Sequence, residues 1–183
     1  MSFSISTDHL ILRDFTEEDS KHYVNQCQDP KYQRFYSEED CSVEKSGQLA
    51  SLFRQQAAEQ PRKQFHLAIT DKASGDYLGI AALRIEGDQQ ASVGCGLIRG
   101  KQGKGVSEEA MAALLSYGFE HLDVHRAYAE TLSKNKAAIK LCQRLGMRIE
   151  AQFRQNRYFK ENWWDTTVLA ILRQEWLVPD LMS

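Results

Sequence analysis

The stretch RGKQGKGVSEEA, Arg99 to Ala110, places three glycines and two lysines directly before a run of acidic and helix-forming residues. The segment before it, ASVGCGLI (91–98), predicts a strand. A helix over about 105–122 is predicted by apolar residues that recur at helical spacing: Ala110, Met111, Leu114, Leu115 and Phe119. Unpaired N–H groups in a first helical turn bind anions, and glycine lets a ligand approach them. A solvated turn, with Glu108 and Glu109 favoured by the helix dipole, accounts equally well for this composition.

Two widespread phosphate-binding loops do not match this stretch. A P-loop aligned on Gly100 and Gly105 needs Lys at the next position, where Val106 stands. A dinucleotide-binding GxGxxG pattern fails because Arg99 or Glu108 occupies the place of its third glycine. A generic nucleotide-binding α/β domain is therefore disfavoured.

Composition narrows the class of protein further. The chain has 183 residues, 42% of them hydrophobic and 26% charged, with a formal net charge of -2. We expect no nucleic-acid partner from this charge, and no membrane span, because no apolar run is long enough. The N-terminus lacks the pattern of a signal peptide, and the four cysteines form no CxxC pair, so we expect a cytoplasmic protein with reduced thiols. The His121/His125 pair lacks the Glu of HExxH, and no metal site is expected.

The order of predicted elements defines the fold class. Turn signals and periodicity predict strands at 9–15, 64–70, 77–85, 91–98, 125–132, 147–159 and 164–176, and helices at 16–28, 43–60, 105–122 and 134–146. The order β-α-α-β-β-β-α-β-α-β-β predicts an α/β (α+β) fold with a mixed, mostly antiparallel seven-stranded sheet and flanking helices. The helix over 105–122 is expected to join its one parallel pair. With no linker or repeat, 1–183 is expected to form a single domain.

Three stretches in this order resemble a known family. Gln102-x-x-Gly105-x-Ser107 is similar to the pyrophosphate loop of the GNAT N-acetyltransferases, with Ser where Gly or Ala is usual. The helix Asn135-x-x-Ala138-x-x-x-Cys142-x-x-x-Gly146 resembles a second family motif. HLILRDFTEED (9–19) and WWDTTVLAILRQEW (163–176) resemble the opening and closing segments of the RimJ/RimL-like, ribosomal-protein-alanine acetyltransferase-like branch. The resemblance covers about residues 8–177.

The resemblance implies a GNAT fold in which strands 91–98 and 125–132 splay into a V that holds acetyl-CoA. Gly94-Cys95-Gly96 would then be a bulge that frees N–H groups near Leu97 and Ile98; a plain bulge of a buried strand is the other interpretation. The expected cofactor-binding residues are Leu97, Ile98, Gln102, Gly103, Lys104, Gly105, Val106, Ser107, Asn135 and Ala138.

The resemblance also identifies positions in or near the catalytic site at which this chain carries a residue that is unusual for the family. Cys142 stands at the position of the Tyr that usually acts as the general acid in the family. Ala138 stands where many relatives carry Ser, and Ser92 stands where Glu is frequent. Asn135 and Cys142 are the catalytic candidates. Cys142 is either a thiol acid or core packing, and we favour packing. Asn135 is expected to position cofactor or substrate, with Ser133 as the helix cap. Possible bases, none of which stands out, are Glu86, Glu130, Glu150 and Tyr158.

The resemblance implies an acetyl-CoA-dependent N-acetyltransferase that acts on a protein N-terminal amine or a small amine by direct attack in a ternary complex. The departures leave open a non-catalytic acetyl-CoA-binding domain that acts as a sensor or partner-binding module. An acceptor groove is expected from Tyr32, Phe35, Tyr36, Tyr158, Trp163 and Trp164; aromatic packing is the alternative. The expected partners are acetyl-CoA and an amine, with no metal, and the protein as monomer or homodimer.

Overall fold

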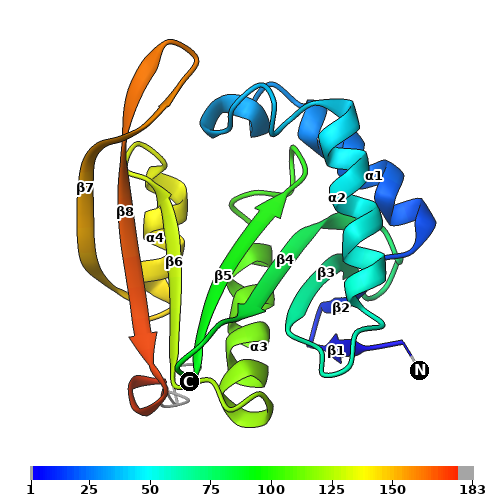
Figure 1. Ribbon diagram of the computed structural model, residues 1–183. Coiled ribbons are helices and arrows are strands. Elements are labelled where there is room, and N and C mark those ends of the chain that lie inside the picture. Colours follow the sequence, from blue (N-terminus) through cyan, green and yellow to red (C-terminus); the bar gives the residue numbers. More distant parts are fainter. Residues whose placement is uncertain (1, 177–183) are drawn as a thin grey trace.

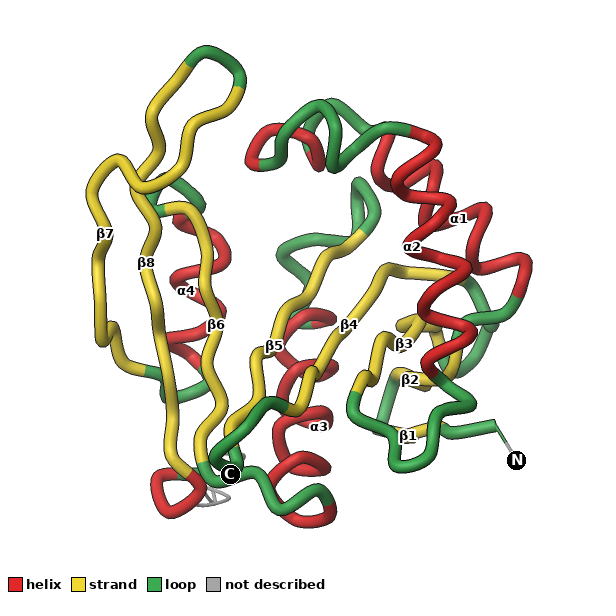
Figure 2. The backbone as a smooth tube through the Cα atoms, viewed as in Figure 1, coloured by secondary structure: helices red, strands yellow, loops and turns green. Residues whose placement is uncertain are grey.

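The computed structural model describes residues 2–176 (Figures 1 and 2). Its helices are α1 (Glu17–Gln28), α2 (Val43–Gln56), α3 (Val106–His121) and α4 (Lys136–Arg144), with short 3-10 helices η1 (Tyr32–Phe35) and η2 (Arg173–Glu175). Its strands are β1 (Ser4–Ser6), β2 (Leu10–Asp14), β3 (Gln64–Asp71), β4 (Tyr77–Ile85), β5 (Gln90–Leu97), β6 (Arg126–Leu132), β7 (Arg148–Phe159) and β8 (Asn162–Leu172).

One sheet joins all of these strands in the order β1-β2-β3-β4-β5-β6-β8-β7. Every neighbouring pair is antiparallel except β5 with β6, which α3 connects, as the sequence predicts. The predicted count of seven strands is one too low, because β1 also belongs to the sheet. This strand has only three residues, too few for a periodic pattern to be recognised, and it is held by pairing from Ser4 opposite Arg13 to Ser6 opposite Ile11.

The helices cover both faces of the sheet, and the strand alternation divides the core in two. On β3, Phe65, Leu67 and Ile69 belong to one apolar cluster together with residues of α3 and α4. Ala68 points the other way and belongs to a second cluster with residues of α1 and α2, including Tyr23. Because β3 and β4 are buried on both faces, they form a rigid centre from which β5 extends.

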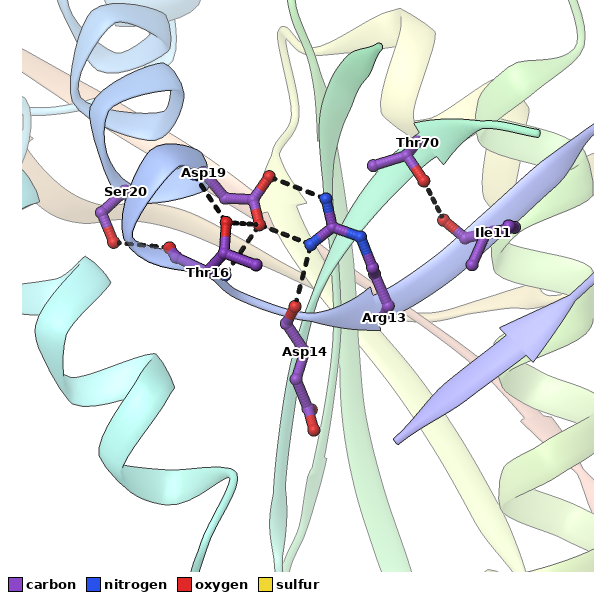
Figure 3. A network of polar contacts seen from close by, with 7 residues as sticks. All are labelled: Ile11, Arg13, Asp14, Thr16, Asp19, Ser20 and Thr70. Atoms are coloured by element: carbon purple, nitrogen blue, oxygen red, sulfur yellow. Dashed lines mark hydrogen bonds and ion pairs between the residues drawn. The ribbon is translucent and has the colours of Figure 1, made fainter. Parts of the chain in front are cut away.

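The start of α1 is fixed by a buried polar network (Figure 3). The predicted capping box is confirmed: Asp19 N–H donates to Thr16 Oγ1, and Thr16 N–H donates to Asp19 Oδ2 at 2.7 Å. Arg13 on β2 donates to the same carboxylate at 2.5 Å and 3.2 Å, and Asp19 is only 3% exposed. Burial by itself raises the pKa of Asp19, but the bonds from Arg13 and Thr16 outweigh it and hold the pKa below its ordinary value.

We predict that Asp19→Ala lowers the free energy of unfolding by about 3 kcal/mol, because it removes the cap and leaves a buried ion pair broken. Since the folded-state pKa is lowered, this stabilisation is complete above the unfolded pKa, about 3.9, and is lost as the pH falls through the folded value. Urea unfolding at neutral and acidic pH measures both effects. Glu18→Ala, which removes the exposed pair with Lys21, is the control and should change stability little.

Candidate functional site

Strands β5 and β6 separate partway along their length (Figure 1). They are paired only from Gln90 opposite Arg126 to Ser92 opposite Tyr128. Beyond that point β5 stays paired with β4 as far as Leu97, and β6 stays paired with β8 as far as Leu132. The two strands therefore diverge into the predicted V, and each keeps one edge without a strand partner.

Two hydrogen bonds show which backbone groups of β5 face this gap. Ile98 N–H donates to Leu78 O on β4, whereas Gln89 O accepts from Arg126 N–H on β6. Backbone groups alternate in direction along an extended strand. The amides of Cys95 and Leu97 therefore point into the gap, whereas the amide of Val93 also faces β6 but belongs to the last pair of the ladder, Ser92 opposite Tyr128. The prediction of a free N–H at Ile98 is wrong, because β4 already occupies that group.

Backbone groups along the edge of β6 also alternate in direction between β5 and β8. Arg126 N–H faces β5, and Ser133 N–H donates to Asp165 O beyond the end of β8's pairing. By alternation the backbone N–H and C=O of Glu130 face the gap. Leu132 O also faces this side, but it accepts from Asn135 N–H. The gap is thus bordered by backbone N–H donors on β5 and by both a backbone N–H donor and a C=O acceptor on β6.

The predicted bulge at Gly94-Cys95-Gly96 is absent. The β4–β5 register runs without a shift from Gly79 opposite Leu97 to Ile85 opposite Ala91. The glycine at 96 instead permits a close approach, since a Cβ there would lie 3.0 Å from the ring of Tyr32. At Gly94, a Cβ would meet no atom within 4 Å, so the sheet surface beside the gap is open there. The strand carries free amides because β6 diverges, not because β5 bulges.

The basic loop lies at the end of β5 and leads into α3. Gly103 and Gly105 both have positive φ, and Gly105 is the N-cap of α3 without a side-chain cap. Gln102 orders the loop from within: its Nε2 donates to Leu97 O at 3.2 Å, and its Oε1 accepts from Gly100 N–H at 3.3 Å. Exposed Lys104 has no ion pair within residues 2–176. The loop therefore keeps open helical N–H groups beside an unpaired cation.

The remaining predicted cofactor residues surround this loop. Val106 is the first residue of α3, and Ser107 follows it in the first turn. The Ser107 hydroxyl contacts Cys95, whose thiol pKa burial raises to about 11 despite that contact. Glu109 is occupied elsewhere, because it accepts from Thr7 Oγ1 at 2.5 Å and from His9 N–H at 2.9 Å.

The structure of helix α4 shows that the predicted N-cap is wrong, and it agrees with the predicted packing of Cys142. Asn135, not Ser133, is the N-cap: its Oδ1 accepts from Ala138 N–H at 3.2 Å. Ser133 is unavailable because its hydroxyl bonds to Thr167 Oγ1 at 2.7 Å. Cys142 is 8% exposed within the cluster under the sheet, and burial raises its thiol pKa to about 11. This placement agrees with the packing interpretation of Cys142.

A first cavity, cavity A, opens beside β6 and has a volume of about 200 Å³. It combines aromatic rings from the α1–α2 connection, carboxylates and residues of the β6–α4 segment. Its lining residues are Phe35, Tyr36, Asp40, Glu130, Thr131, Leu132, Asn135, Arg157 and Thr166.

Two of the three candidate carboxylate bases are engaged elsewhere: Glu86 accepts a hydrogen bond from Tyr128, and Glu150 accepts one from Arg126. Glu130 has no hydrogen-bond partner within residues 2–176 and lines the cavity.

A second cavity, cavity B, lies beside the end of β5 and has a volume of about 300 Å³. It is lined by His22, Asn25, Gln26, Asp29, Tyr32, Leu97, Ile98, Arg99 and Gln102. Tyr32 in this cavity stacks on Tyr36 of cavity A, with ring centroids 5.0 Å apart. The two cavities therefore share an aromatic wall. Sequence reasoning did not select Gln26 or Asp40, because neither lies in a motif.

The aromatic residues predicted for the acceptor groove divide into two groups. Phe35, Tyr36 and Tyr32 line the cavities, whereas Tyr158, Trp163 and Trp164 lie on the β7–β8 hairpin outside both linings. Trp164 stacks on Phe159 at 5.0 Å, which is the packing alternative. The hairpin reaches the opposite side of the gap through Lys160, whose Nζ donates to Gln33 O at 2.7 Å.

No helix in the described part of the chain is long and apolar enough to cross a membrane. Within residues 2–176, no three histidine, cysteine or acidic side chains gather in a way that could hold a metal ion.

Comparisons with known proteins agree with this geometry. The model of a family described as acetyltransferase (GNAT) domain matches residues 9–148. An uncharacterized N-acetyltransferase of Bacillus subtilis, YnaD, is 36% identical over 75 residues, which are 41% of this chain and 44% of that protein. The chain thus matches less than half the length of that relative.

Solved structures extend the likeness to almost the whole chain. Spermidine N-acetyltransferase from Vibrio cholerae, in complex with CoA and spermine, has a TM-score of 0.79 at 19% identity, over 92% of this chain and 98% of that one. RimL, a ribosomal L7/L12 alpha-N-protein acetyltransferase solved in complex with coenzyme A, has a TM-score of 0.79 at 18% identity, over 93% of this chain and 98% of that one. At these identities the likeness shows a shared fold.

Proposed function

The chain belongs to the GNAT family and is an N-acetyltransferase that uses acetyl-CoA, and we propose that it acetylates a primary amine by direct attack in a ternary complex formed at the gap between β5 and β6. The observation that carries this proposal is the divergence of the two strands beyond Ser92 and Tyr128. It leaves a row of backbone amides in line with the glycine loop of α3.

The residues along this line fit an amide-containing chain that ends in a diphosphate. The amides of Cys95 and Leu97 offer donors to carbonyl groups, as the alternation of β5 and the end of its pairing with β6 indicate. Gly103, Lys104 and Gly105 offer unpaired backbone donors and a positive charge to the phosphates at the N-terminus of α3. When bound, acetyl-CoA supplies an activated thioester.

Cavity A is the proposed binding site for the amine. Phe35 and Tyr36 give it an apolar wall, and Asp40 and Glu130 place carboxylates where a protonated amine can enter. An amine with an ordinary pKa is mostly protonated at neutral pH and must lose a proton before it attacks. Cavity A therefore needs a group that both attracts the ammonium ion and accepts its proton.

Glu130 is the proposed general base. Its carboxylate has no competing hydrogen bond within the described chain, and its backbone borders the gap. In the first step of the proposed reaction, the ammonium ion transfers one proton to Glu130, directly or through a water molecule. The free amine then forms the new N–C bond to the acetyl carbonyl. Backbone N–H groups of β5 stabilise the negative charge that develops on the carbonyl oxygen.

The departing thiolate does not require Cys142. CoA leaves with the electrons of the broken C–S bond, and the second proton released by the nitrogen reaches the thiolate through water in the gap. The Cys142 thiol is packed in the core on the α4 side of the sheet. Its raised pKa keeps it protonated, but burial supports a packing role.

We predict that Gly105→Asp weakens acetyl-CoA binding at least about tenfold more than Gly105→Asn, measured by isothermal titration calorimetry. Gly105 has φ +77°, and both replacements tolerate this left-handed conformation better than other residues. They differ in charge alone, so the comparison separates backbone strain from repulsion of phosphate. Equal affinities for the two variants would move the phosphates away from α3.

We predict that Glu130→Gln lowers kcat about 100-fold at neutral pH, because an amide cannot accept the proton. The loss should shrink as the pH approaches the pKa of the amine, which then loses its proton without a base. Cys142→Ala is the matched comparison: it should cost roughly 1 kcal/mol of stability and change kcat only a few-fold. Steady-state rates across pH with a primary amine measure both, and a reversed order of the two effects would contradict the assignment.

A further inference from the structure

Gln26 presents an unused hydrogen-bond donor to cavity B. Its side chain is in α1, is 4% exposed, and lines the cavity. Its Nε2 is buried and has no hydrogen-bond partner within residues 2–176. An unpaired buried donor destabilises the folded protein, so such a group needs an explanation.

The orientation of this amide is fixed by a second buried residue. Tyr77 Oη donates to Gln26 Oε1 at 2.9 Å. Tyr77 is 7% exposed, and rotating the amide by 180° would leave its hydroxyl proton without this acceptor. The carbonyl of Gln26 is therefore directed to Tyr77, and the NH2 group is the side that remains for a ligand.

The free NH2 group lies beside the end of β5, next to the gap. A Cβ added at Gly96 would be 3.3 Å from Gln26 Nε2 and 3.4 Å from the hydroxyl of Tyr32. Leu97, the next residue, lines cavity B and directs its own amide into the gap. The open surface over Gly94 continues from this point toward the base of the V. A molecule bound in the gap can thus extend into cavity B along the α1 side of β5.

We propose that cavity B is a second acceptor subsite that binds a carbonyl group of the substrate, with Gln26 Nε2 as its donor. This inference rests on the proposed function, and it narrows the acceptor to amines that carry an amide or another carbonyl a few bonds from the reacting nitrogen. The aromatic wall of Tyr32 and Tyr36 places this subsite next to the amine in cavity A.

The chemistry of the donor separates this class from polyamines. A polyamine at neutral pH presents N–H donors and positive charge, neither of which can satisfy an NH2 group. An amide oxygen accepts the bond and replaces the missing partner. Asp29, the carboxylate of this cavity, is already paired with Arg99 at 3.2 Å and accepts from Lys31 N–H, so it is not free to attract a second ammonium group.

Two probes with the same backbone of atoms, which differ in their carbonyls and therefore in their charge, test the proposal. Glycylglycinamide and diethylenetriamine have the same backbone of atoms, with each C=O of the first replaced by CH2 in the second. Their binding to the CoA-loaded protein is measured by calorimetry, and acetyl transfer to each is measured in parallel. The variants are Gln26→Glu, which keeps the acceptor for Tyr77 and loses the donor, and Gln26→Leu, which loses both without adding charge.

Wild-type protein should bind glycylglycinamide, and both variants should weaken it about tenfold or more. Binding of diethylenetriamine should be unchanged in the Leu variant and unchanged or tighter in the Glu variant. The KM for glycylglycinamide should rise in parallel, while kcat and the affinity for acetyl-CoA stay within a few-fold.

Three results would overturn the subsite: no binding of glycylglycinamide to wild-type protein, equal losses for both probes, or a matching loss of acetyl-CoA affinity, which would place the cofactor against Gln26. Acetyl transfer that continues in any of these cases would leave the proposed function intact. Absence of transfer to every amine, with the binding contrast preserved, would contradict the proposed function and not the subsite.

Discussion

The separation of two parallel strands is the constraint on which the rest of this structure depends. β5 and β6 share only the pairs from Gln90–Arg126 to Ser92–Tyr128. Past that point, main-chain groups that a continuous sheet would satisfy internally are left without strand partners. Buried backbone groups rarely remain unpaired. A gap of this kind is stable only if solvent or a ligand enters it, and an extended ligand with alternating carbonyl and amide groups satisfies it well.

The rest of the fold keeps the gap from closing. β5 is anchored by its full-length pairing with β4, and β6 by its pairing with β8. Beneath the sheet, α3 and α4 pack with the strands in one apolar cluster, which includes Met111, Leu114 and Cys142. On the other face, α1 and α2 form a second cluster, and Arg13 and Asp19 fix where α1 begins. Because α1 starts at a fixed point, Gln26 and the η1 turn are placed along the open edge of β5.

Sequence reasoning recovered what depends on local patterns. The TEED capping box, the helical stripe of α3 and the strand–loop–helix order around Gln102 and Gly105 are local features, and each is present where predicted. The resemblance of three motifs gave the family. The predicted roles of the cofactor-loop residues, of Asn135 and of Cys142 remain predictions about a ligand.

The errors arise where tertiary contacts decide between local options. Ser133 and Asn135 are both good caps, and the bond from Ser133 to Thr167 on β8 settles the choice. Paired glycines suggested a bulge, but the space at Gly96 is required by Tyr32, which is distant in sequence. β1 is too short to show a pattern. Gln26 lies inside an ordinary amphipathic helix, and only the position of Tyr77 reveals that its NH2 group is free.

The most direct test of the account is amide hydrogen exchange at the gap, measured by NMR with and without acetyl-CoA. The amides of Cys95 and Leu97 should exchange more slowly, by about tenfold or more, when the ligand is saturating. Those of Gly94, Gly96 and Ile98, which face β4, should change much less. Tight binding of acetyl-CoA with no change at Cys95 and Leu97 would contradict the claim that the diverging edge of β5 holds the cofactor.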